Sequence, residues 1–144
     1  MTAKLLLRIA AILMLLHTLG HTIGAITWKD APNPAVGQVI NGMQSQHFDF
    51  MGRSVTLAGF FEGYGFIMIG VLPLVAIFLW LFGSQSANPL TKSLLPVLAV
   101  FLLVMGVIEY IYFFPFAAAF TFLAGLCSVI ALVVIKRGKS TIQA

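Results

Sequence analysis

Two histidines and two glutamates interrupt otherwise apolar stretches of this sequence. The segment LLHTLGHTIG places His17 and His21 four positions apart, so that both imidazoles lie on one face of a helix. Glu62 and Glu109 lie in two further apolar segments. An imidazole titrates near neutral pH, and ionisable groups within a membrane usually face one another in the protein interior. These residue types therefore predict a site that binds a small molecule or exchanges protons.

The segments that carry these residues are long enough to cross a membrane. The chain has 144 residues, of which 60% are hydrophobic and 8% are charged, whereas a soluble domain carries about 25% charged residues. Four apolar stretches reach the roughly 20 residues that a spanning helix needs: about 5–28, 54–82, 94–114 and 116–135. We therefore expect one all-α transmembrane domain, residues 1–144, built as an antiparallel four-helix bundle.

The distribution of charge predicts the orientation of this bundle. If the four helices alternate in direction, six cations fall on one side of the membrane: Lys4, Arg8, Lys92, Lys136, Arg137 and Lys139. By the positive-inside rule, both termini are then cytoplasmic. The formal net charge of +4 reflects this topology and attraction to anionic lipid. The lipid bilayer is thus the expected partner, and no nucleic-acid partner is expected.

The longest connection, between the first two helices, is expected on the outer side. An Asn-Pro pair suited to a helix start is followed by apolar residues at helical spacing, which predicts a helix at about 34–46. This stretch is too short and too polar to span a membrane, so we expect an amphipathic helix lying in the interface. The same loop offers His47, Asp49 and Arg53 as a lid over the bundle.

The four ionisable residues are expected at a similar depth. Counted from the outer ends of their helices, both histidines and both glutamates fall in one band, roughly 9 to 16 Å below the outer surface at about 1.5 Å per residue. Three tyrosines near that level can supply hydroxyl donors: Tyr64, Tyr110 and Tyr112. The aromatic runs GFFEGYGF and EYIYFFPF surround both glutamates. They are read either as lipid-facing bulk or as an apolar pocket for a quinone, sterol or isoprenoid-like ligand.

Two other interpretations of the same residues stay open. Two histidines and a glutamate match one zinc ligand set, but H-E-x-x-H is absent, and a di-iron bundle would need histidines where Gly65 and Tyr112 stand. A haem would need His47 as second axial ligand, because His17 and His21 share one helix face. Alternatively, the cluster only fixes helix packing, through contacts worth about 0.6 kcal/mol on average. The sequence assigns neither a cofactor nor a reaction.

Small residues indicate where helices can approach one another. Gly20 with Gly24, and Gly59 with Gly63, are small-xxx-small pairs, which favour close packing within the bundle, in a homo-oligomer or against another membrane protein. The single cysteine, Cys127, lies in the fourth apolar run with no second thiol. We interpret it as a small packing residue.

Four segments of the chain also resemble a known family. LLRIAAILMLLHTLGHTIGA, MQSQHFDFMGRS, FFEGYGFIM and YIYFFPF are similar to an uncharacterised family of small four-helix bacterial inner-membrane proteins, loosely DoxX-like in architecture. In that family the positions before the glycine pattern often read Tyr-Trp-Asp-Phe. The matching stretch here is LAGFFEG, so Glu62 is interpreted as a local substitute for that aspartate. The resemblance implies a fold and a bacterial inner-membrane location, and it implies no activity.

Overall fold

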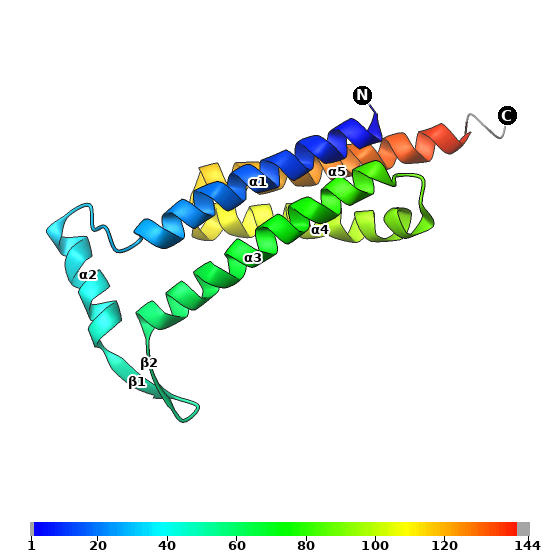
Figure 1. Ribbon diagram of the computed structural model, residues 1–144. Helices are drawn as coiled ribbons and strands as arrows, with labels where there is room; N and C mark the ends of the chain where they lie inside the picture. Colours follow the sequence, from blue (N-terminus) through cyan, green and yellow to red (C-terminus); the bar gives the residue numbers. More distant parts are fainter. Residues whose placement is uncertain (1, 141–144) are drawn as a thin grey trace. The chain divides into compact units, whose positions relative to one another are not determined.

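The computed structural model describes residues 2–140 of the chain, and only the backbone for 138–140, so the Lys139 side chain lies outside the described residues. The described part contains five helices and one two-stranded hairpin (Figure 1). Four helices are long and apolar enough to cross a membrane, which confirms that part of the expected fold. They are α1 (Ala3–Thr27), α3 (Leu57–Ser84), α4 (Pro89–Tyr112) and α5 (Pro115–Ser140).

Helix α4 begins at Pro89 rather than near residue 94. The side chain of Asn88 accepts a hydrogen bond from the Leu90 N–H at 2.9 Å, and the proline occupies the first turn, where its missing N–H costs nothing. This start escapes a search for apolar runs because the first turns of α4 are polar. Helix α5 likewise continues beyond the expected end at 135, since the residues that follow are polar but helical.

The long connection contains a helix, α2 (Pro34–Ser45), that ends one residue before the expected position. Its N-cap is Asn33, whose side-chain oxygen accepts from the Val36 N–H at 3.0 Å. Such a cap satisfies a backbone donor that has no partner within the helix.

A β-hairpin follows α2, and the sequence reading did not anticipate it. Strands β1 (His47–Phe50) and β2 (Arg53–Thr56) pair antiparallel. Met51 and Gly52, at the turn, have φ values of 51° and 80°, and positive φ at both central residues is the mark of a type I′ turn. Since β2 uses residues 53–56, α3 starts at Leu57 rather than at 54.

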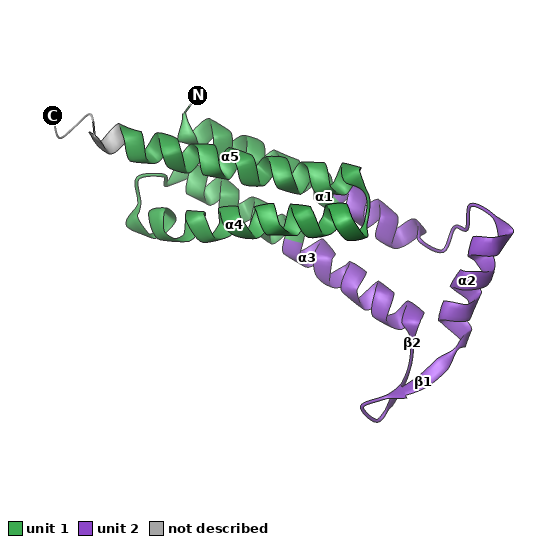
Figure 2. Cartoon of the chain, turned by 180° about the vertical axis from the view of Figure 1, so that it is seen from behind, with its two compact units in different colours: residues 1–18, 72–144 green, residues 19–71 purple. Residues whose placement is uncertain are grey.

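The chain forms two compact units, and the division between them falls within α1 and α3 (Figure 2). Unit 1 comprises residues 1–18 and 72–144, and unit 2 comprises residues 19–71. Pro73 stands inside α3 close to this division. Because proline has no N–H, α3 lacks one hydrogen bond of its backbone ladder there.

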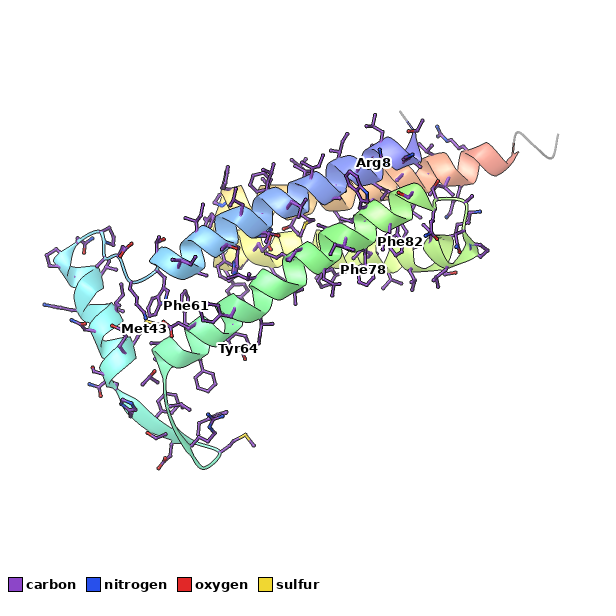
Figure 3. The ribbon with its side chains drawn as sticks, in the orientation of Figure 1. Arg8, Met43, Phe61, Tyr64, Phe78 and Phe82 are labelled. Carbon is purple, nitrogen blue, oxygen red and sulfur yellow. The ribbon has the colours of Figure 1, made fainter. Side chains whose placement is uncertain are left out.

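Within unit 1, α4 and α5 pack side by side as an antiparallel pair joined by a short turn (Figure 1). Glycines allow their close approach: a Cβ added at Gly106 would lie 3.0 Å from the Phe122 backbone nitrogen, and one at Gly125 would lie 2.9 Å from a Leu103 methyl carbon. The core of this unit is formed by fully buried apolar side chains: Leu7, Met14, Leu72, Leu79, Leu95 and Leu102. On the surface of α3, Phe78 stacks with Phe82 (Figure 3).

The glycine pairs expected to mediate packing are placed differently. Among the described residues, a Cβ added at Gly20, Gly24 or Gly63 would meet no atom within 4 Å, and one at Gly59 would meet only the Thr56 hydroxyl. The close approaches instead use glycines that lie outside the small-xxx-small pattern. Association with another chain through the open glycines stays a prediction.

Candidate functional site

His17 and Glu109 are brought together in unit 1, from α1 and α4. The distance from His17 Nε2 to Glu109 Oε1 is 3.8 Å, and the two side chains are only 7% and 9% exposed. Both belong to the predicted site. At this separation the two groups interact as charges when the imidazole is protonated, although the distance exceeds that of a hydrogen bond.

A third group, the hydroxyl of Thr121 on α5, completes this cluster. Thr121 Oγ1 lies 2.8 Å from His17 Nδ1, and the threonine is fully buried. The Thr121 side chain also makes a polar contact with Glu109. Sequence reasoning missed this residue because it was restricted to ionisable groups. A hydroxyl shortly after Pro115, in an otherwise apolar run, was the available signal.

The cluster leaves one polar atom of Glu109 unpaired. Glu109 Oε2 is buried and has no hydrogen-bond partner among the described residues. A buried polar atom without a partner costs free energy, and a buried charge costs more. This oxygen therefore favours either a proton on the carboxyl group or a partner supplied by another molecule.

The hydroxyl, imidazole and carboxyl of the cluster stand in the same order as in a serine-hydrolase triad. In such a triad the hydroxyl oxygen attacks a bound substrate, so it must be accessible. Thr121 is fully buried. The arrangement is therefore suited to holding a proton, and we assign it no nucleophilic step.

His21 lies in unit 2 and has a separate partner. Its Nε2 is 3.1 Å from the carbonyl oxygen of Gly65 on α3. Since a carbonyl only accepts, His21 Nε2 carries the hydrogen and donates it. A Cβ added at Gly65 would lie 3.5 Å from Ala25 Cβ, so α1 and α3 approach closely at this point. The hydrogen bond thus joins the parts of α1 and α3 within this unit.

Glu62 also lies in unit 2, where it pairs with Lys29. The Lys29 Nζ to Glu62 Oε1 distance is 2.6 Å, and the side chains are 49% and 33% exposed. Lys29 Nζ also lies 5.6 Å from the ring centroid of Trp28, whose ring packs at 4.9 Å from that of Phe61. The sequence reading treated Lys29 only as a topology charge. The structure instead gives Glu62 a cationic partner directly after α1.

The three tyrosines of the predicted site are exposed. Tyr64 is 68% exposed on α3 in unit 2 (Figure 3), and Tyr110 and Tyr112 on α4 are 67% and 76% exposed. Side chains so placed on α4 do not cover the buried Glu109 of the same unit. Their aromatic rings have the exposure expected of residues that face lipid or the membrane interface.

The three predicted lid residues all lie in the hairpin of unit 2. His47 and Asp49 belong to β1 and Arg53 to β2. The Nδ1–H of His47 donates to the Ser45 carbonyl oxygen at 3.0 Å. An open hollow of about 400 Å³ lies between the hairpin and the start of α3, lined in part by His47 and Arg53. The hairpin thus presents a cationic hollow of its own.

Metal binding was one of the alternatives drawn from the sequence. Within residues 2–140, no group of three or more His, Cys, Asp or Glu side chains is arranged to hold a metal ion. His17 with Glu109 is a two-residue pair.

Comparison of the chain with protein-family models, with curated proteins and with solved structures finds no match. The functional argument therefore depends on the geometry of the two units.

Proposed function

We propose that this protein is a multi-pass membrane protein that holds and exchanges a proton at His17 and Glu109, in contact with a small lipophilic ligand. The observation that carries the proposal is the pairing of an imidazole and a carboxyl group at 3.8 Å, both less than a tenth exposed. Four helices long and apolar enough to span a membrane surround this observation with a consistent context.

The proton follows from the cost of burying charge. An isolated buried carboxylate is strongly unfavourable, and an imidazolium at ion-pair distance offsets much of that cost. A neutral carboxyl beside a neutral imidazole is the alternative, and it contains the same total number of protons. Thr121 bonds to His17 Nδ1, which orients the ring so that Nε2 faces Glu109. The pair can therefore pass a proton between its members without exposing a charge.

The ligand is supported by the unpaired carboxyl oxygen. Glu109 Oε2 is buried without a partner among the described residues, so a hydroxyl group of a bound molecule would satisfy it. A sterol or isoprenoid alcohol offers such a donor, and a quinone carbonyl would accept from the protonated carboxyl. Each of these molecules is lipophilic and enters from the membrane.

The membrane placement that we propose has three parts. Both termini are cytoplasmic according to the distribution of cations, so the His17 and Glu109 pair lies in the outer half of the helices. Helix α2, with only Ile40 buried, lies in the outer interface. The membrane is the bacterial inner membrane, which the resemblance to DoxX-like proteins supports. His21 and Glu62 serve to position the outer parts of α1 and α3 through their bonds to Gly65 and Lys29.

Infrared difference spectroscopy between acid and alkaline samples tests the proton. We expect one protonated-carboxyl signal in the purified protein, absent from Glu109→Gln and altered in His17→Ala. Glu62→Gln is the matched control, because its carboxylate already has a lysine partner, and it should keep the signal. A spectrum that Glu109→Gln leaves unchanged would contradict the proposal.

Native mass spectrometry with metal analysis, on protein extracted in mild detergent, tests the ligand. We expect a bound organic adduct that Glu109→Gln loses and Glu62→Gln retains. If the cluster only fixes helix packing, Glu109→Gln will lower stability with no loss of adduct or of proton uptake. Stoichiometric metal or haem that depends on His17 would support the third interpretation instead.

A further inference from the structure

The hollow beside the hairpin in unit 2 is a second site, separate from His17 and Glu109. We propose that it binds the phosphate group of a membrane lipid. The inference uses the proposed membrane placement, but it does not depend on proton exchange.

The lining of the hollow has the chemistry that phosphate requires. It includes Arg53, His47, Ser54 and Thr56, together with the ring of Phe60. A guanidinium offers paired N–H donors that match two phosphate oxygens, and the two hydroxyls can each donate one hydrogen bond. The Thr56 oxygen accepts from the Gly59 N–H at 3.1 Å, which leaves its own hydrogen free to donate. The volume of about 400 Å³ accommodates a headgroup.

Arg53 is available for such a ligand. Unit 2 has two cationic side chains, Lys29 and Arg53. Lys29 is engaged by Glu62, whereas Arg53 makes no ion pair with any residue that the structure describes. Asp49 is its nearest acidic neighbour in sequence, but Asp49 pairs with Ser54 while Arg53 pairs with Phe50. Adjacent strand pairs point to opposite faces, so the carboxylate and the guanidinium lie on different faces of the hairpin.

His47 can contribute a second donor. Its Nδ1–H is used by the Ser45 carbonyl, which fixes the ring and leaves Nε2 for a ligand. Nε2 donates only when the imidazole is protonated. Arg53 is therefore the principal binding residue.

The apolar surroundings indicate a lipid rather than free phosphate. Phe48 and Phe50 on β1 are 39% and 50% exposed, and Met51 at the turn is 91% exposed. Phe50 is the cross-strand partner of Arg53, so an apolar ring stands beside the cation. In a membrane interface, phosphate groups lie directly above acyl chains. Exposed apolar side chains beside a phosphate-binding arginine fit that boundary.

Native mass spectrometry of the full-length protein tests this site. The protein is purified in dodecyl maltoside without phosphate and mixed with phosphatidylglycerol. We expect one tightly retained lipid per chain, and an affinity about tenfold lower in Arg53→Gln, because a charge-assisted hydrogen-bonded pair is lost. Arg53→Lys keeps the charge without the paired donors and should be intermediate. Lys136→Gln, which removes an exposed cation from unit 1, should bind as the unaltered protein does.

Two comparison ligands complete the test. A galactosyl diacylglycerol has similar chains and no phosphate, and we expect it to bind much more weakly than phosphatidylglycerol. Inorganic phosphate should displace the lipid only at far higher concentration. Equal retention of phosphatidylglycerol by Arg53→Gln would overturn the proposal, as would equal binding of the galactolipid. Displacement by inorganic phosphate at matched concentration would overturn the assignment to a lipid. Circular dichroism of Arg53→Gln checks that the exposed substitution leaves the fold intact.

Discussion

His17 Nε2 and Glu109 Oε1 lie 3.8 Å apart, joined from two helices that are otherwise almost entirely apolar. The hydrogen bond from His17 Nδ1 to Thr121 brings in a third helix. Three helices thus meet at polar groups in a region where lipid offers no alternative partner. The stability of unit 1 and the proposed proton exchange depend on the same few atoms.

Thr121→Val removes the hydroxyl with little change of shape. We expect the free energy of unfolding to fall by about 0.6 to 1.7 kcal/mol, the usual range for an interhelical hydrogen bond in a membrane protein. Ser128→Ala is the control, because the Ser128 hydroxyl is equally buried but bonds only to Ala124 of its own helix. Denaturation in mixed micelles measures both. Equal losses in the two variants would mean that the bond to His17 adds nothing.

Gly106→Ala should destabilise unit 1 strongly. The new Cβ would lie 3.0 Å from Phe122 Cβ and from the Phe122 nitrogen, so the α4 and α5 backbones would have to separate. Overpacking of this kind costs about 1 to 3 kcal/mol. Gly70→Ala, where no atom lies within 4 Å among the described residues, should be neutral or stabilising by up to about 1 kcal/mol. Thermal unfolding followed by circular dichroism distinguishes the two outcomes.

The two glutamates should respond differently to salt. The Lys29–Glu62 pair is partly exposed, so added salt screens it. Any difference in melting temperature between the unaltered protein and Glu62→Gln should therefore vanish at high salt. The difference for Glu109→Gln should persist, because Glu109 is buried beside His17. Melting curves at low and high sodium chloride provide the measurement, and matching salt responses would contradict this assignment.

Gly52→Val should open the hairpin without unfolding the helices. Gly52 has φ of 80°, a conformation that a β-branched residue adopts only with strain. We expect faster hydrogen exchange at the amides of β1 and β2 and an unchanged melting temperature. Gly42→Ala, at a position in α2 with no atom within 4 Å among the described residues, serves as the control. Met51→Asn should slow exchange, since asparagine tolerates positive φ.

Apolar run length was a sufficient signal for the four long helices and a poor one for their ends. The start of α4 at Pro89 depends on the cap at Asn88, which is a local polar signal. The hairpin was missed for a similar reason. Alternation in HFDF and the Met-Gly turn spans too few residues to compete with the helical spacing that runs up to His47.

Depth counting predicted the meeting of His17 and Glu109 but not the other partners. Depth says how far along a helix a residue lies, and it says nothing about which way the side chain faces. Glu62 therefore meets Lys29, and His21 meets a backbone carbonyl, neither of which an inventory of buried ionisable groups would find. Thr121 was outside that inventory for its chemistry alone.

The separation of 104 positions between His17 and Thr121 has a consequence for biosynthesis. During insertion, α1 enters the membrane first and α5 last, so the imidazole waits for its hydroxyl until nearly the whole chain has been made. Throughout that interval α1 carries an incompletely bonded polar group in lipid. A truncated chain that ends before α5 should consequently be a preferred substrate for membrane quality-control proteases, and the polar cluster would report that assembly is complete.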